Sequence, residues 1–295
     1  MKPVNISIIV NFFNMRREAE RTLFSMTKAY QNNSADIEYE VLAVDNGSSL
    51  PLDPEWVAGF GDGFKYLYYE SGNTSPCQAI NHAAKTVAGD YVMICIDGAR
   101  ILSPGILNYT RQCLKLHGRP FVYTLGMHIG EKPQNYLVDY GYNQAVEDKL
   151  LSEIDWRSNG YRLFGISSLG LSSKNGYFSE VSESNCFTMK KRDFLEMGGL
   201  DESFTGLGGG LANLDFFNRV HANLGFSPIM LLGEATFHQF HGGVASNAPL
   251  DKHPWDEMAR EYREIKGRAY KKVYRPPEYH GFVSNEYHSK LIPFL

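Results

Sequence analysis

The first half of the chain alternates between short apolar runs and segments with apolar residues at helical spacing. The apolar runs predict β-strands over residues 6–10, 40–44, 64–69, 90–96 and 121–125. Between them, the spacing predicts a helix over 16–30, and Ser-Pro pairs predict helix starts at Ser75 and Ser103. This alternation is typical of a parallel sheet with both faces covered. We therefore predict an α/β fold that binds ligands beyond the carboxyl ends of its strands.

The second half of the chain is less regular and richer in glycine. Its predicted elements are loops over 159–177, a strand over 186–189, helices over 191–197 and 212–224, and a strand over 228–232. After residue 248, a helix with Trp255, Met258, Tyr262 and Ile265 on one face precedes a tail rich in Pro and Tyr. We interpret residues 1–245 as a single α/β domain and residues 246–295 as a C-terminal helix and wrapping tail.

Length, charge and cysteine content argue against nucleic-acid-binding and zinc-binding classes of protein. The chain has 295 residues, enough for one large α/β domain or two small ones, and a formal net charge of −4. A weakly acidic chain lacks the basic surface that broad nucleic-acid binding needs, so we expect no nucleic-acid partner. The four cysteines form no CxxC pair and are poor zinc candidates. They are Cys77, Cys95, Cys113 and Cys186.

The sequence contains no candidate membrane anchor. No stretch approaches the ~20 apolar residues that a membrane-spanning helix needs, and residues 1–13 lack the features of a signal peptide. Scattered free thiols also favour a reducing compartment. We expect a cytoplasmic protein without a transmembrane segment, whose contact with a membrane-bound acceptor would be peripheral.

Polar side chains follow two of the predicted strands. Asp45 and Asn46 end the second strand, where a carboxylate can accept hydrogen bonds from a base or a ribose and Asn-Gly permits a tight turn. An ordinary polar turn is the alternative. Asp97 ends the fourth strand, and a divalent cation bound to phosphates would give this carboxylate a partner. Its alternative role is to cap the turn before Ser103.

Two histidines, His238 and His241, lie three residues apart in a segment that ends in two glycines. The glycines favour a loop over a helix. A histidine there could complement Asp97 as a metal ligand, and we predict His238 for this role. A purely structural histidine is the alternative.

Five segments carry a resemblance to a known family. They are Ser7–Asn14, Val44–Ser48, residues 73–84, residues 89–105 and Gly198–Phe204. In this order they resemble the first strand, the second-strand motif, the segment before the metal strand, the DxD strand and the GGFDExF segment of family 2 glycosyltransferases of the GT-A fold. The resemblance covers residues 4–243. It implies a mixed, mostly parallel sheet flanked by helices, in a nucleotide-sugar-binding domain.

The resemblance also implies an activity and a set of site residues. The protein would move a sugar from a nucleotide-diphosphate sugar, preferably a UDP-sugar, to a glycan, lipid-linked or protein hydroxyl, assisted by Mn²⁺ or Mg²⁺. Under this hypothesis the nucleotide is bound by Phe12, Asn14, Asp45, Asn46, Asn81 and Asp97. Asp97 and His238 hold the metal, and the sugar or acceptor lies near Glu183, Asn185 and Gly209.

The sequence departs from the family pattern at two motifs. Ala99 stands where the second carboxylate of Asp-x-Asp is expected, and Ala212-Asn213 stands where a Glu-Asp pair is expected. An amide cannot take a proton from an acceptor hydroxyl at neutral pH. We therefore expect Asp215, with Asn213 beside it, to assist the acceptor, or else to cap and orient its helix.

Three alternatives remain, two from these departures and one from the alternating strand–helix pattern. The segment Asn213–Asp215 also resembles that of polypeptide N-acetylgalactosaminyltransferases, which retain anomeric configuration, so inversion and retention both stay open. A catalytically inactive nucleotide- or glycan-binding module is the second hypothesis. A dinucleotide-dependent oxidoreductase is disfavoured, because residues 11–14 follow the first strand where a GxGxxG motif would be expected.

Overall fold

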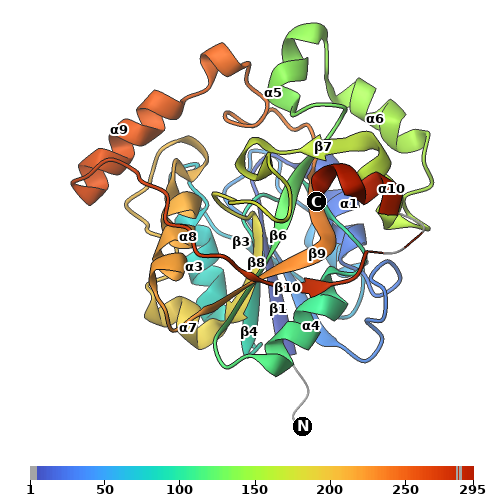
Figure 1. Cartoon of the computed structure of the whole chain (residues 1–295), viewed down its shortest axis with the longest axis horizontal. Helices are drawn as coiled ribbons and strands as arrows, with labels where there is room; N and C mark the ends of the chain where they lie inside the picture. The colour runs from blue at the N-terminus through green and yellow to red at the C-terminus, as the bar shows by residue number, and fades with distance from the viewer. Residues whose placement is uncertain (1–4, 284, 286–287) are drawn as a thin grey trace.

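The computed structural model describes residues 5–283, 285 and 288–295, and a single mixed sheet forms its centre (Figure 1). Its strands are β1 (Asn5–Phe12), β2 (Glu38–Asp45), β3 (Phe64–Tyr68), β4 (Tyr91–Cys95), β5 (Arg100–Leu102), β6 (Pro120–Ile129), β7 (Ser167–Leu169), β8 (Cys186–Lys190), β9 (Ser227–His238) and β10 (Glu278–Gly281). The main strand order is β10-β9-β6-β8-β4-β1-β2-β3, with β5 paired to β9 and β7 to β6. The prediction of an α/β fold with a mostly parallel sheet is confirmed.

Helices cover both faces of this sheet. They are α1 (Arg16–Ser25), α2 (Pro54–Ala58), α3 (Cys77–Thr86), α4 (Ile106–Leu116), α5 (Gln134–Leu137), α6 (Gln144–Ser152), α7 (Lys191–Glu196), α8 (Ala212–Ala222), α9 (Trp255–Lys266) and α10 (His288–Leu291). Ile8 and Val10 of β1 share a core with apolar residues of α1 and α4. Ile9, between them, points to the opposite face and belongs to the core that includes α3 and α8. The alternation along β1 therefore divides the interior into two cores.

Strand β8 runs against its neighbours. It is antiparallel to both β4 and β6, whereas β1 is parallel to β2 and β4, and β6 is parallel to β9. The beginning of β8 therefore lies at the same edge of the sheet as the ends of the parallel strands. The residues just before Cys186 reach that edge.

Strand β9 is longer than the sequence predicted, because a break within it is a bulge and not an end. Its first part pairs with β6 up to Met230, opposite Tyr123, and pairing resumes with Ala235 opposite Leu125. Gly233, with a φ of +80°, lies inside this irregularity. The predicted strand over 228–232 stops at the bulge, and the true strand continues to His238.

The predicted helix over 16–30 is also wrong at its C-terminal end. Helix α1 ends at Ser25, because side chains, and not the next turn of the helix, donate hydrogen bonds to its last carbonyl groups. The amide of Gln31 donates to the carbonyl of Ser25 at 2.8 Å, and the hydroxyl of Thr27 donates to that of Phe24 at 2.8 Å. Side-chain hydrogen bonds of this kind replace the next turn of a helix.

The two Ser-Pro pairs precede helices, but neither serine is the capping residue. Helix α3 begins at Cys77, with Pro76 as its N-cap. Helix α4 begins at Ile106, because the hydroxyl of Ser103 donates to the carboxylate of Glu234. That fully buried carboxylate also accepts from the backbone N–H of Gly105 at 3.0 Å and from the hydroxyl of Tyr161 at 2.7 Å.

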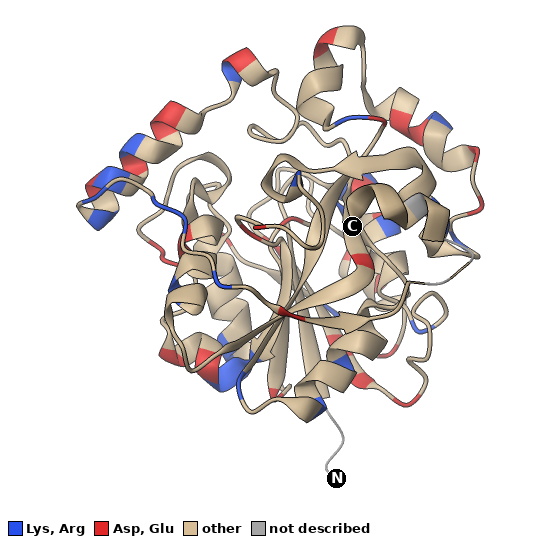
Figure 2. Ribbon diagram, viewed as in Figure 1, with Lys and Arg blue, Asp and Glu red and all other residues tan. Residues whose placement is uncertain are grey.

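The segment after residue 248 forms the predicted helix and then joins the sheet. In α9, Met258 and Tyr262 are buried, while Trp255 is 44% exposed. The chain then crosses α8, where the side chain of Asn218 bonds to the backbone of residues 271 and 273, and β10 pairs in parallel with β9 (Figure 1). Figure 2 shows acidic and basic residues interspersed along α9. None of the described helices is long and apolar enough to cross a membrane.

Candidate functional site

The carboxyl edge of the sheet gathers the polar residues of the candidate site. Asp97 lies two residues beyond β4, and His238 is the last residue of β9, although β8 and β6 lie between these strands. Strand β5 bridges the gap, because Arg100 pairs in register with His238. Gly98 makes the turn possible: a Cβ atom there would lie 2.6 Å from the carbonyl oxygen of Asn11 and 2.4 Å from the ring of Phe12.

Asp97, His238 and His241 form a cluster with the spacing of metal ligands. Oδ2 of Asp97 is 3.1 Å from Nε2 of His238, and its Oδ1 is 3.8 Å from Nε2 of His241. One ligand atom from each residue lies within 4.8 Å of the other two. Adjacent ligands of an octahedral cation at about 2.1 Å are separated by about 3 Å, so small side-chain rotations would suffice to close this cluster around an ion.

A chain of hydrogen bonds fixes which nitrogen of His238 faces Asp97. Oδ1 of Asn247 accepts from three backbone N–H groups, those of residues 241–243, so its amide nitrogen must be the group that donates to Oε1 of Gln134 at 2.7 Å. That oxygen also lies 2.8 Å from Nδ1 of His238 and can only accept, so Nδ1 carries the proton. In the neutral ring, the lone pair of Nε2 then faces the Asp97 carboxylate and the hydroxyl of Ser246, each 3.1 Å away.

The electrostatics of the cluster favour a bound cation. Complete burial lowers the pKa of His238 to about 4, against the opposing effect of Asp97. Burial acts to raise the pKa of Asp97, but His241, His238 and Arg100 outweigh it and hold that pKa well below its usual range. A neutral imidazole and an ionised carboxylate are both metal-ligating forms. The residues therefore fit a divalent cation.

Two further cationic or donor groups surround the cluster. Arg100 is 7% exposed, and its Nε lies 3.5 Å from Oδ2 of Asp97. Among the described residues, Nε and Nη1 of Arg100 have no hydrogen-bond partner. His128 accepts from the backbone N–H of Gln134 through Nδ1 at 3.2 Å, which leaves its Nε2–H as a donor in the neutral ring. Burial, His238 and Arg100 lower the pKa of His128 well below its usual value.

The predicted nucleotide-binding residues at β1 and β2 hold the adjoining loops together. Both carboxylate oxygens of Asp45 accept backbone N–H bonds, from Ser48 at 2.8 Å and Leu52 at 3.1 Å. Asn14, with a φ of 55°, accepts from Ser49 through its side chain. The side chain of Phe12 is fully buried, so only its backbone and neighbours can face a ligand.

Asn46 and Asn81 differ in how fully their amides are used. Asn46 donates to the carbonyl of Ser75 at 2.9 Å, while its buried Oδ1 has no partner among the described residues. Both ends of the Asn81 amide bond to residues 200–202, which ties α3 to the turn that resembles GGFDExF. Asn46 therefore retains a free acceptor and Asn81 does not.

The predicted sugar or acceptor residues lie apart: Glu183 and Asn185 precede β8, beyond β4 from the nucleotide loops, whereas Gly209 lies beside Ser75, which bonds to Asn46. The carbonyl of Asn185 accepts from the N–H of Ile96 at 3.0 Å, which extends the β4–β8 ladder toward Asp97. Gly209 has a φ of +82° and packs its backbone against Pro76. The carboxylate of Glu183 accepts a hydrogen bond from the amide of Asn213.

Asp215, predicted to assist the acceptor, is engaged in two ion pairs. Its Oδ2 accepts from Nε of Arg219 at 2.8 Å, and its Oδ1 lies 3.0 Å from Nζ of Lys266. Lys266 also reaches Asp201 at 2.7 Å, so these charges connect α8 and α9 to the preceding turn. Neither oxygen of Asp215 can accept a substrate proton without breaking an ion pair.

Sequence reasoning did not identify several members of the site. His241 was visible through its spacing from His238 but was not assigned as a ligand. Arg100, Gln134 and Asn247 carried no local signal, because their roles depend on the β5–β9 pairing and on contacts between α5 and the loop after β9.

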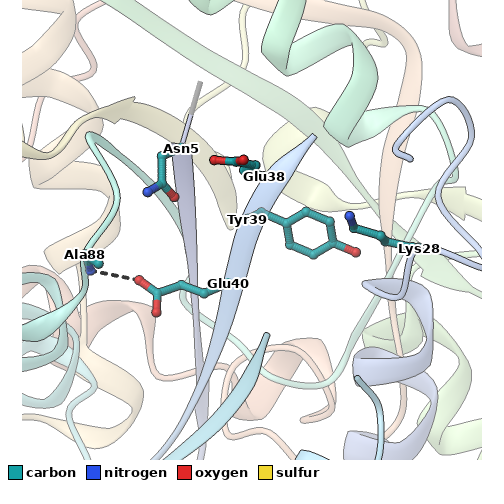
Figure 3. A pocket seen from close by; sticks show the side chains of 6 residues that line it. All are labelled: Asn5, Lys28, Glu38, Tyr39, Glu40 and Ala88. Carbon is teal, nitrogen blue, oxygen red and sulfur yellow. Dashed lines mark hydrogen bonds between the residues drawn. The ribbon is translucent and has the colours of Figure 1, made fainter. Parts of the chain in front are cut away.

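A separate hollow of about 330 Å³ lies at the opposite, amino edge of the sheet (Figure 3). It is lined by Asn5, Lys28, Glu38, Tyr39, Glu40 and Ala88. Its most buried carboxylate, Glu40, is already bonded to Ser7, Lys65 and the N–H of Ala88. The hollow lies at the edge of the sheet away from Asp97 and His238, and is not the candidate site.

Comparison with known proteins identifies the architecture. No family model and no curated protein sequence matches the chain. A crystal structure of S. aureus TarS matches 92% of the chain with a TM-score of 0.53 and 13% identity, and the chain spans 41% of that protein. TarS 1–349 with UDP gives a TM-score of 0.51 at 13% identity, over 92% of this chain and 68% of that one.

A second similar protein is a mannosyltransferase. The mannosyltransferase PcManGT of Pyrobaculum calidifontis, in complex with GDP-Man and Mn²⁺, matches 94% of this chain and 67% of its own, with a TM-score of 0.50 and 14% identity. Both proteins are glycosyltransferases with the GT-A architecture. At this identity the likeness concerns the fold. The chain therefore has the GT-A glycosyltransferase fold.

Proposed function

We propose that the protein is a glycosyltransferase that moves a sugar from a nucleotide-diphosphate sugar to a hydroxyl acceptor, assisted by a divalent cation. The observation that carries the proposal is the Asp97–His238–His241 cluster at the carboxyl edge of the sheet. Similar structures support the ligand class, since TarS was solved with UDP and UDP-GlcNAc and PcManGT with GDP-Man and Mn²⁺. A UDP-sugar is the first donor we propose, with a glycan, lipid-linked or protein acceptor.

Different side chains would bind the cation, the diphosphate and the nucleotide. Asp97, His238 and His241 would hold the cation, which would supply positive charge to the diphosphate as it leaves. Arg100 offers unpartnered N–H groups beside Asp97, suited to an anionic oxygen. The free Oδ1 of Asn46, at the end of β2, offers an acceptor on the nucleotide side of the same edge.

The metal preference follows from the ligand types. Imidazole nitrogens suit transition metals, whereas Mg²⁺ prefers oxygen ligands and strict octahedral geometry. A cluster with two imidazoles and one carboxylate therefore favours Mn²⁺ over Mg²⁺.

A non-catalytic nucleotide- or glycan-binding module is the second candidate. It is favoured by the ion pairs that occupy both oxygens of Asp215 and by the amide of Asn213 where the resembling family has a carboxylate. Turnover distinguishes the two candidates, because a binding module would recognise the donor without releasing the nucleotide.

The first experiment is thermal unfolding with UDP, GDP, dTDP and CMP, each with and without Mn²⁺. A ligand at 100 times its Kd adds ~2.7 kcal/mol to the free energy of unfolding. For a chain of this size, each kcal/mol raises the Tm by roughly 2–4 °C. We expect a Mn²⁺-dependent rise with one diphosphate, and its loss in Asp97→Asn. No nucleotide-dependent rise would contradict the transferase and a nucleotide-binding module, and would leave only a glycan-binding module. A rise without release of nucleotide from UDP-GlcNAc or GDP-mannose would favour the binding module.

A further inference from the structure

Glu183 occupies a distinctive position at the site edge. Cys186 pairs with Cys95 across β8 and β4, and the next link joins Asn185 to Ile96. Continuing this antiparallel register brings Glu183 alongside the turn that contains Asp97 and Gly98. The chain reaches this place only because β8 runs opposite to its neighbours.

Three other carboxylates considered for this site already have partners or another role. Asp97 belongs to the metal-ligand cluster, Asp45 accepts two backbone N–H bonds, and Asp215 is paired with two cations. Glu183 forms no ion pair within the described part of the chain. Its hydrogen-bond partners are neutral groups, the amide of Asn213 and the hydroxyl of Ser172.

Asn213 holds Glu183 in place from the first turn of α8. Its amide nitrogen donates to Oε2 of Glu183, while its own Oδ1 is buried without a described partner. The nitrogen is therefore identified as the end that faces the carboxylate, since the oxygen could not donate. Asn213 stands where the resembling family has a carboxylate. Through its amide it holds the carboxylate of Glu183, which comes from another segment of the chain.

The surroundings of Glu183 suit a proton acceptor. Burial raises the pKa of Glu183, against the opposing effects of Arg100, Asn213 and Ser172. The titratable and charged groups that interact with it are Arg100 and Asp97 at the sheet edge and Tyr270 in the C-terminal segment. A carboxyl whose pKa moves toward neutrality is better matched to general base catalysis.

We propose that Glu183 is the general base of the reaction, with Asn213 as its positioning residue; this inference rests on the proposed transferase function. The acceptor O–H gives its proton to Glu183, and the acceptor oxygen forms a bond to the anomeric carbon. The bond between that carbon and the diphosphate oxygen breaks, and its electron pair leaves with the diphosphate. Attack from the face opposite the leaving group inverts the anomeric configuration.

The test compares wild type, Glu183→Gln and Glu180→Gln in release of nucleotide from UDP-GlcNAc and GDP-mannose, with Mn²⁺ and with water and glycerol as acceptors. Glu180 is a matched control in the same segment, 54% exposed and paired with Lys272. We expect Glu183→Gln to lower kcat at least about 100-fold, with the donor KM and the Tm unchanged. Glu180→Gln should behave as wild type.

A second variant separates a chemical role from a structural one. Glu183→Ala should regain part of its turnover when formate is added, because a small carboxylate can occupy the vacated space and accept the proton. If wild type is active, two results would overturn the assignment of Glu183 as the base: full activity of Glu183→Gln, or no rescue of Glu183→Ala by formate. Either result would leave the proposed transferase function intact. An inactive wild type with every donor would overturn both.

Discussion

The carboxylate of Asp97 lies 3.1 Å from Nε2 of His238, and that nitrogen presents its lone pair because Nδ1 donates to Gln134. A lone pair facing a carboxylate is repulsive unless a proton or a cation lies between them. Since burial lowers the pKa of His238 to about 4, a proton does not serve at neutral pH. The hydroxyl of Ser246, 3.1 Å from Nε2, can donate to this lone pair, and the arrangement of Asp97, His238 and His241 fits a divalent cation.

Removal of His241 tests the composition of the metal site. We expect His241→Ala to lower Mn²⁺ affinity at least about tenfold, since it removes one of three protein ligands, and wild type to prefer Mn²⁺ to Mg²⁺. Titration calorimetry in the presence of UDP would measure both effects. His117→Ala is the control, because His117 lies 3.7 Å from Glu278 and outside the cluster. Equal affinity in wild type and His241→Ala would contradict the site.

The loop after β9 offers a test of the hydrogen-bond chain behind His238. Asn247→Ala removes the donor that orients Gln134 and should lower Mn²⁺ affinity about 10–100-fold, the usual effect of losing an outer-shell partner. Asn135→Ala is the matched control, since the side chain of Asn135 donates to the carbonyl groups of Ala245 and Ala248 in the same loop, and not to the side chain of Gln134 or His238. If both variants lose affinity equally, loop order and not ring orientation is responsible.

Much of the architecture could be predicted from local patterns. The central strands were predicted from apolar runs that end in polar residues, and the structure has β1, β2 and β4 at these runs. The pattern missed the three-residue β5 and the end of β9, because β5 is too short for periodicity and the bulge at Gly233 resembles a strand end.

Gly98 is predicted to tolerate no side chain. A Cβ atom there would overlap the ring of Phe12 and the carbonyl of Asn11, so Gly98→Ala should cost about 1–3 kcal/mol of stability through overpacking. Chemical denaturation would measure the loss, and Mn²⁺ affinity should fall as Asp97 is displaced. Gly118→Ala is the control, because a Cβ there meets no atom within 4 Å. Equal stability of the two variants would contradict the packing argument.

The buried Glu234 should make stability depend on pH. Burial raises its pKa to about 7, against the bonds from Ser103, Tyr161 and Gly105. Protonation therefore favours the folded state, and this contribution is present below about pH 4.5 and lost as the pH rises through 7.

Glu234→Gln isolates this contribution from those of other buried groups. The variant should gain stability relative to wild type between pH 5 and pH 8, by up to about 3 kcal/mol for a shift of this size. Denaturation of both proteins at several pH values would measure the difference. Glu180→Gln should follow wild type, since Glu180 is 54% exposed. If the difference in free energy of unfolding between Glu234→Gln and wild type did not change with pH, the prediction would be contradicted.

The candidate site was less accessible to sequence reasoning than the fold. Asp97 was predicted because it ends an apolar strand, and His238 because it is one of two closely spaced histidines in a glycine-flanked segment; the structure brings the two residues together. Asp215 drew attention through its helix position, but its ion pairs with Arg219 and Lys266 depend on how α9 packs. The contact between Glu183 and Asn213 joins segments that no periodicity relates.

The pairing of β10 with β9 also has a consequence for biosynthesis. Strand β9 carries His238 at its end, where β5 pairs with it, while the outer backbone groups of its first part, residues 229–232, are paired by residues 278–281. On the ribosome, β9 emerges well before these residues and presents an open edge to the crowded cell. A chain interrupted between α9 and β10 would expose that edge permanently and invite pairing with a second molecule.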